Sequence, residues 1–197
     1  GDLTLSASNL LVKVNAGGGT SGGVANTTVA NFSATDFDGN GSADGSLTVD
    51  AGAGNTVTLD YSRKLLVAAG TLTFDLFGFV AGSGSFAFAA QEVYVDLNAD
   101  GTLGAGDLEN ASVATFALDG VSLFAGAGGI GFSVTGGRLG FARIQPADTA
   151  DTRRYTAARA SLGTATLVGI PGITAAAANL TLEINEAGAA SGPAPAA

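Results

Sequence analysis

The sequence predicts an all-β fold made mostly of antiparallel strands. Short runs in which apolar and polar residues alternate recur along the chain, and this alternation is typical of strands with one covered face. Asp-Gly and Gly-rich turns separate the runs, and such turns join antiparallel neighbours. Because 46% of the residues are hydrophobic and only 13% are charged, the composition is that of a folded domain rather than a disordered chain.

We expect the strands to form an elongated β-sandwich-like module with at most one or two short helical turns, one of them at residues 107–111. Segments 65–80 and 84–97 are apolar on both faces, so each face needs a cover. Cover of this kind suits a central strand, or a layer stacked on the next layer. A β-solenoid or prism is therefore the alternative architecture. The core is expected to be built from small side chains, since 31 residues are glycine.

Two strand-like segments near the ends of the chain share one pattern. Residues 3–14 alternate, slip in phase at Ser8 and Asn9, and then resume, which predicts a β-bulge. Residues 173–184 repeat this design, and a constant offset of 170 residues pairs Asn9 with Asn179, Leu10 with Leu180 and Asn15 with Asn185. We predict that residues 1–186 are a single repeat module and that residues 172–186, equivalent to 2–16, open the next repeat. Residues 187–197 are expected to be a flexible linker.

Composition excludes several functions. The chain has a net charge of -9 with only eight basic residues, so no nucleic-acid partner is expected. Cys and His are absent, which excludes disulfides, thiolate nucleophiles and imidazole chemistry. No apolar run reaches the roughly 20 residues that a membrane-spanning helix needs. Because the chain begins at Gly1 without Met or a signal peptide, we expect it to be an excised or processed fragment.

The segment from residue 96 to 109 has the spacing of a calcium loop. Oxygen ligands stand at positions 1, 3 and 5 of a twelve-residue loop, a glycine, Gly101, follows at position 6, and a carboxylate closes position 12. The candidate ligands are Asp96, Asn98, Asp100, Asp107 and the backbone carbonyl of Thr102. The ending Asp107-Leu108 resembles the loops of dockerin modules.

A second acidic loop spans residues 36–45. It also places oxygen ligands at positions 1, 3 and 5 and a glycine at position 6, but Leu47 at position 12 cannot ligate. The candidate ligands are Asp36, Asp38, Asn40, Ser42 through its carbonyl, and Asp44, with Asp50 or a residue from another segment completing the set. This loop resembles those of thrombospondin-type extracellular repeats. About two structural Ca²⁺ ions are predicted, and they would change the formal charge from -9 to -5.

A wider resemblance covers nearly the whole chain. Its blocks resemble the long tandem repeats of very large secreted bacterial surface proteins of the adhesin type. The blocks are residues 36–45, 72–80, 84–88, 123–126, 167–170 and 179–185. The resemblance implies an extracellular or cell-surface location and a repeated architecture, and millimolar calcium outside the cell makes weak sites useful.

The sequence therefore predicts a calcium-stabilised structural repeat that extends or scaffolds an extracellular surface protein. Its expected partners are neighbouring repeats or like subunits, with any surface glycan or protein receptor elsewhere in the parent protein. One alternative is a self-assembling filament or matrix subunit joined by strand addition. Another is a carbohydrate- or partner-binding module, which three Tyr and no Trp disfavour. No enzymatic activity is expected, and the polar cluster at 148–154 is interpreted as a surface ion-pair network.

Overall fold

The computed structural model describes residues 3–104 and 106–189, and it confirms the all-β class. These residues contain eleven strands and one 3-10 turn, η1 (Phe32–Ala34), and no helix in them is long and apolar enough to cross a bilayer. The strands are β1 (Leu3–Asn15), β2 (Thr20–Ser21), β3 (Val24–Ala25), β4 (Leu47–Gly52), β5 (Asn55–Leu59), β6 (Leu65–Leu76), β7 (Val80–Val95), β8 (Leu108–Ala127), β9 (Ile130–Gln145), β10 (Arg153–Val168) and β11 (Ala176–Ala189).

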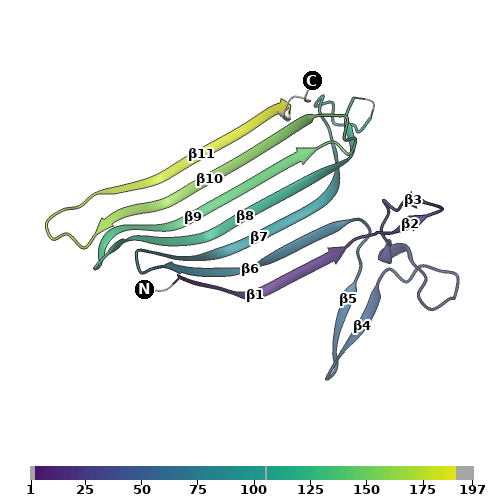
Figure 1. The fold of residues 1–197 in the computed structure, drawn as a ribbon, viewed down its shortest axis with the longest axis horizontal. Helices are drawn as coiled ribbons and strands as arrows, with labels where there is room; N and C mark the ends of the chain where they lie inside the picture. Colours follow the sequence, from purple (N-terminus) through teal and green to yellow (C-terminus); the bar gives the residue numbers. More distant parts are fainter. Residues whose placement is uncertain (1–2, 105, 190–197) are drawn as a thin grey trace. The chain divides into compact units, whose positions relative to one another are not determined.

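Seven long strands form one antiparallel sheet in the order β1-β6-β7-β8-β9-β10-β11 (Figure 1). From β6 onward each strand pairs with its neighbour in the chain, which confirms the antiparallel prediction. In the described part of the chain these strands make one open layer, where we expected two facing layers. The first three residues of the predicted linker, 187–189, continue β11, and residues 190–197 lie outside the described part.

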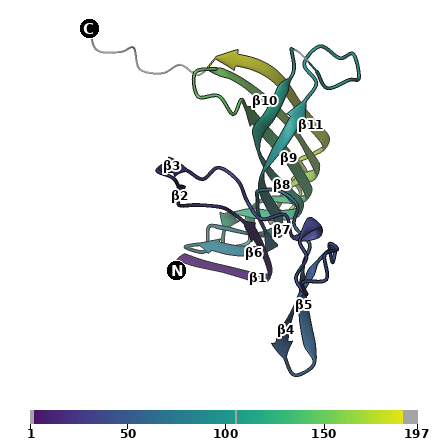
Figure 2. The ribbon, with the colours of Figure 1, turned by 90° about the vertical axis from the view of Figure 1, so that its right-hand side faces the viewer.

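The chain divides into two compact units, the loop unit at Lys13–Leu66 and the sheet unit formed by Gly1–Val12 with Val67–Ala197. The loop unit contains η1 and two short hairpins, β2–β3 and β4–β5 (Figure 2). Asn15 is buried and donates from Nδ2 to the carbonyls of Ala30 at 2.9 Å and Arg63 at 3.0 Å. These bonds join the beginning, middle and end of the unit.

The sheet strands are longer than the sequence pattern indicates, because each strand continues through its change of phase. The sequence pattern predicts separate short strands at 113–118 and 121–125, at 130–135 and 139–144, and at 155–161 and 164–170, whereas the structure joins each of these pairs into one strand, β8, β9 and β10. Between the halves of β8 the pairing register shifts, and Gly120 has a φ of 62° there. Gly136 in β9 has a φ of 70°. Glycine adopts this left-handed conformation without steric cost, so the strand changes phase and continues.

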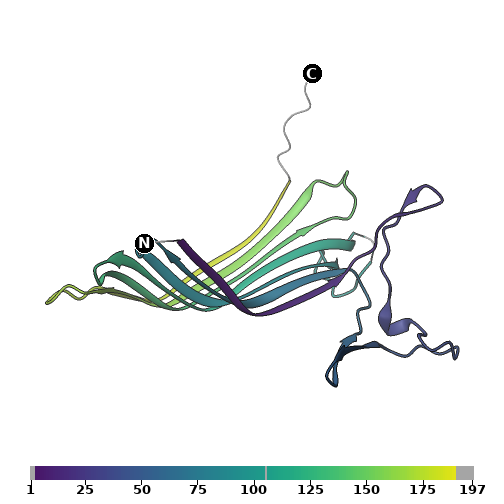
Figure 3. The ribbon, with the colours of Figure 1, turned by 60° about the horizontal axis from the view of Figure 1, so that its bottom comes forward.

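These phase changes line up across the whole sheet. Figure 3 shows the seven strands bending together at mid-length. A Cβ added to Gly70 would lie 2.9 Å from the Ser8 carbonyl oxygen, and one added to Gly163 would lie 2.9 Å from that of Thr135, so neighbouring strands approach closely here. We call this row of residues the bend line. It consists of Asn9, Gly70, Gly84, Gly120, Gly136, Gly163 and Asn179.

On the side of the bend line nearer the β7–β8 loop, large apolar side chains form two cross-strand rows on one face of the sheet. Cross-strand neighbours there form the rows Phe88-Phe116-Phe141-Ala158-Ile184 and Phe86-Leu118-Leu139-Ala160-Leu182. On the opposite face, ion pairs join Asp119 to Arg138 at 2.7 Å and Arg159 to Glu183 at 3.1 Å. The apolar rows are largely half-exposed. Among the described residues, the buried apolar side chains are Leu108, Ala111 and Val113, all at the start of β8.

Close backbone approach predicts the effect of adding a methyl group to a glycine of this sheet. At Gly82 in β7 a Cβ would lie 2.7 Å from the Ser122 carbonyl oxygen and 2.9 Å from the Phe74 ring. Gly82→Ala should therefore lower the free energy of unfolding by about 1–3 kcal/mol in urea titrations. Gly140→Ala in β9 is the control, because no atom lies within 4 Å of its Cβ, and it should be neutral or stabilise by about 0.5 kcal/mol. Equal effects of the two substitutions would contradict this packing.

Candidate metal centre

The loop at residues 36–44 lies between η1 and β4 in the loop unit. Its base is closed by the Asp44 backbone N–H, which donates to the Thr35 carbonyl at 3.1 Å. Phe37 at the start of the loop stacks on Phe32 of η1, with ring centroids 5.9 Å apart. Gly41 has a φ of 90°, so the chain turns sharply where the calcium-loop spacing predicts a glycine.

Three carboxylates converge in this loop. One oxygen from each of Asp36, Asp38 and Asp44 lies within 4.8 Å of the other two, and all three residues are exposed. Carboxylates held this close repel one another in the absence of a cation, and a hard cation takes such oxygens as ligands. This group can therefore hold a metal ion.

Backbone donors fix the Asp36 carboxylate. The N–H of Gly41 donates to Oδ2 at 2.7 Å, and the N–H of Gly39 donates to Oδ1 at 2.6 Å. These bonds hold the pKa of Asp36 below the ordinary value for aspartate, and the bond from Gly41 has the largest effect. Asp36 is thus kept in the ionised form that a cation requires.

The remaining predicted ligands of this loop are linked to one another. Asp38 accepts from the backbone N–H of Asn40 at 3.0 Å and from its Nδ2 at 2.9 Å, while Asp44 accepts from the Phe37 N–H at 2.7 Å. The Asn40 side-chain oxygen accepts from the Ser42 N–H at 2.8 Å. The structure thus brings the three aspartates together. Ligation by Asn40 and by the Ser42 carbonyl stays a prediction.

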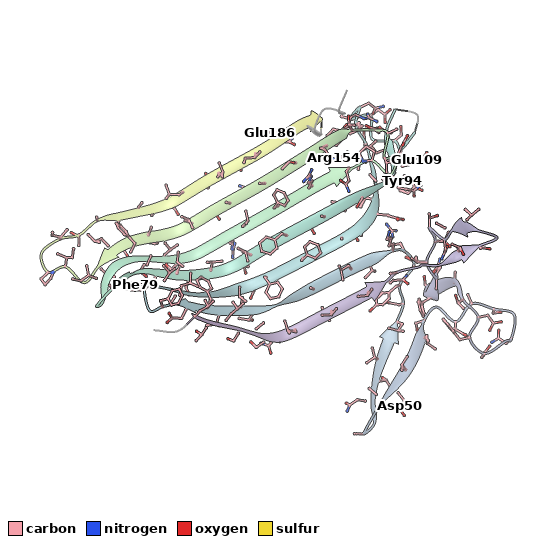
Figure 4. All side chains as sticks on the ribbon, viewed as in Figure 1. Asp50, Phe79, Tyr94, Glu109, Arg154 and Glu186 are labelled. Carbon is pink, nitrogen blue, oxygen red and sulfur yellow. The ribbon has the colours of Figure 1, made fainter. Side chains whose placement is uncertain are left out.

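Asp50, the candidate for a further ligand, lies outside the group of three carboxylates. It stands in the β4–β5 hairpin, where its Oδ1 accepts from the Gly52 N–H at 2.7 Å (Figure 4). The carboxylate is therefore engaged in its own turn. This location makes Asp50 a useful control residue for the metal centre.

The second predicted calcium loop, residues 96–107, is the turn between β7 and β8. The Val95–Leu108 pair closes its base, and Figure 4 labels the adjacent residue of each strand, Tyr94 in β7 and Glu109 in β8. Asp96 accepts from the backbone N–H groups of Ala99 at 2.7 Å and Gly101 at 3.0 Å. The loop is therefore organised around the carboxylate at its first position.

Asp100 and Asp107 are also engaged within this loop. Asp100 accepts from the Thr102 hydroxyl at 2.6 Å and from the Thr102 N–H at 2.7 Å, and these bonds lower the pKa of Asp100. Asp107 accepts from the N–H groups of Leu97 at 2.9 Å and Gly104 at 2.8 Å. Among the described residues, the three-carboxylate group is found at residues 36–44 and not in this loop. Calcium ligation by Asp96, Asn98, Asp100, Thr102 and Asp107 stays a prediction.

The helical turn expected at 107–111 is wrong, because β8 begins at Leu108. Leu108 pairs with Val95 and Ala111 pairs with Val93. Both Leu108 and Ala111 are buried, so this segment is drawn into the sheet by pairing and by burial of its apolar side chains. The favourable N-cap residue Asp107 does not outweigh these interactions.

Two further features bear on function. Of the ion-pair network expected at 148–154, the structure shows one pair, in which Arg153 donates to Asp151 from Nε at 2.9 Å and from Nη2 at 2.6 Å. A shallow hollow of about 420 Å³ lies on the sheet, and its lining includes Phe74 and Ser122. Asp75 is the one titratable side chain among the described residues of that lining.

Comparison of the chain with protein-family models, with curated protein sequences and with solved structures found no match.

The lowered pKa of Asp36 predicts how the loop responds to acid. Because the folded-state pKa lies below the ordinary value, ionised Asp36 stabilises the fold at neutral pH, and this stabilisation is lost as the pH falls through the lowered pKa. In calcium-free buffer, NMR titration of the Asp36 carboxyl carbon should give a pKa below that of an unstructured aspartate. The destabilisation caused by Asp36→Asn should shrink on acidification. An ordinary pKa for Asp36 would contradict the hydrogen bonds described.

Proposed function

We propose that the chain is a calcium-stabilised structural repeat, a unit that extends or scaffolds an extracellular bacterial surface protein. The observation that carries this proposal is the equivalence of β1 and β11. These strands occupy the two edges of one sheet and run in the same direction (Figure 1). A module whose last strand matches its first is built to be followed by another like itself.

The equivalence of the two strands extends to the backbone. Asn9 has a φ of 52° and Asn179 a φ of 56°, and the two residues stand at the constant offset of 170. Asparagine in a left-handed conformation within a strand is uncommon. Its presence at corresponding positions of both edge strands supports a common origin of the two segments as one repeated strand.

A second asparagine supports the repetition of the loop unit. Asn15 anchors residues 13–66 by its bonds to Ala30 and Arg63, and Asn185 stands 170 residues later in β11. Asn15 is buried by the segment that it holds, whereas Asn185 is exposed. A second loop unit following β11 would give Asn185 the same role.

Calcium in this proposal stabilises the loop unit. Asp36, Asp38 and Asp44 would hold one ion, which would cancel the repulsion among their charges and favour the folded loop over its unfolded states. The 96–107 loop would hold the other of the two expected ions. Exposed sites of this kind bind weakly, and extracellular calcium is concentrated enough to fill them. An extracellular location is therefore part of the proposal.

The role of calcium predicts a metal-dependent melting temperature. Calcium at millimolar concentration should raise the Tm of the chain by several degrees relative to buffer with chelator, because the ion binds the folded state. The double variant Asp36→Asn/Asp38→Asn should lose the part of this shift that the ion in its loop contributes. Asp50→Asn removes one carboxylate of the same unit outside the group of three and should keep the shift. A Tm that calcium leaves unchanged would reject the proposed role.

The two loops can be separated by binding stoichiometry. Calorimetric titration of the chain with Ca²⁺ should give about two sites, and the Asp36→Asn/Asp38→Asn variant should retain one. Asp96→Asn/Asp107→Asn should lose the other site. If this second pair of substitutions leaves the stoichiometry unchanged, residues 96–107 form a turn held by its own hydrogen bonds.

A further inference from the structure

The free edge of β1 presents a long row of unpaired backbone groups. Among residues 3–104 and 106–189, β1 has one neighbour in the sheet, β6, and no strand pairs with its other edge. Its side chains are correspondingly exposed, with 70% of Leu5 and 65% of Val12 accessible. Long apolar edge strands readily pair with a further strand, so the chemistry of this edge indicates a β-strand partner.

We propose that β1 of one copy of this chain pairs through its free edge with β10 of a second copy, in the direction and register that β11 has in a single copy. One continuous sheet would then pass from copy to copy. The inference rests on the proposed function, because it names the partner of the repeat and the strands that join them. The donor copy keeps its own β1–β6 pairing, and only β11 of the acceptor copy must give way.

The register follows from the equivalence of β1 and β11. β10 pairs with β11 through Leu162↔Leu180, Ala160↔Leu182 and Thr164↔Ala178. The constant offset of 170 replaces the three β11 residues with Leu10, Val12 and Ser8. Leu10 is identical to Leu180, Val12 is apolar like Leu182, and Ser8 is small like Ala178. β1 would therefore extend the apolar rows of the sheet as β11 does.

The bend line selects this partner over an unrelated strand. In the ladder between β10 and β11, Gly163 lies opposite Asn179, where the chain has its left-handed residue. A straight strand would lose its pairing with β10 on one side of this point. Asn9 gives β1 the same bend at the same place, with a φ of 52°.

One charged position differs between the two strands and supplies a test of the register. Glu183 of β11 forms the ion pair with Arg159, whereas the equivalent residue of β1 is Lys13. The proposed pairing therefore places Lys13 opposite Arg159, and this repulsion favours β11 in the competition for β10. Lys13→Glu in the donor should strengthen the pairing between copies.

Disulfide trapping tests the pairing, because the chain contains no cysteine of its own. The acceptor is the full chain with Ala160→Cys and with Thr181→Pro/Leu182→Pro in β11. Alternate residues of a strand direct their N–H groups to opposite sides, so one of two adjacent prolines removes a bond to β10. The donor is the full chain with Val12→Cys. Oxidation of the mixture should yield the disulfide-linked pair of chains.

Matched variants make the outcome specific. A donor with Leu11→Cys, whose side chain points to the other face, should cross-link at least tenfold less than Val12→Cys. Adding Lys13→Glu to the Val12→Cys donor should raise the yield about twofold to fivefold at low salt. A second acceptor, Ala160→Cys with native β11, is unfolded and refolded together with the donor, so the test does not depend on the prolines.

The proposal is overturned if neither acceptor cross-links, or if Leu11→Cys cross-links as well as Val12→Cys. Running the cross-linking reaction with calcium and with chelator distinguishes failure of the strand pairing from failure of the proposed function. If the chains cross-link but calcium leaves their Tm unchanged, the role of the metal is rejected and the pairing is retained. A calcium-dependent Tm without cross-linking would reject the pairing and keep the role of the metal.

Discussion

The structure depends on seven neighbouring strands bending in step along one line. Hydrogen-bonded ladders continue through a bend only where each strand bends opposite its neighbours, and here glycine or asparagine stands at every crossing of the bend line. Few side chains are buried, since Leu108, Ala111 and Val113 form the buried apolar core of the described residues. The backbone ladder and the close approach of small residues must therefore supply much of the stability.

A single open sheet also leaves two edges and two faces to be covered. Matching edge strands solve the first problem when copies follow one another, because each unit then supplies the strand that the next requires. The metal centre is independent of this arrangement. Its three aspartates lie in one short loop of the loop unit, whereas the edge strands belong to the sheet, so an ion held by these aspartates and the pairing of edge strands would involve different residues.

Local patterns in the sequence predicted the fold class, the change of phase at Asn9, where φ is positive, and the contact between Asp151 and Arg153, because each depends on neighbouring residues. The sheet topology depends on pairing between distant segments, so the sequence pattern predicted a sandwich-like module or a solenoid, whereas the long strands of the described residues form one sheet. Strand lengths were underestimated because a bulge at Gly120 interrupts the alternation as a strand end does. Loop spacing alone favoured residues 96–107 as the calcium site, yet among the described residues three carboxylates converge at 36–44. In the 96–107 loop, Asp107 instead accepts hydrogen bonds from backbone N–H groups of its own loop.

Hydrogen exchange across a junction measures most directly whether the sheet is built to continue. A chain of two units, residues 1–170 followed by residues 1–197, contains one strand that serves both as β11 and as β1. In the single chain, alternate amides of β1 should exchange rapidly, because one edge is open. In the two-unit chain, the amides of the shared strand should be protected at consecutive residues on both sides of its left-handed asparagine. An alternating pattern that persists in the shared strand would contradict the account.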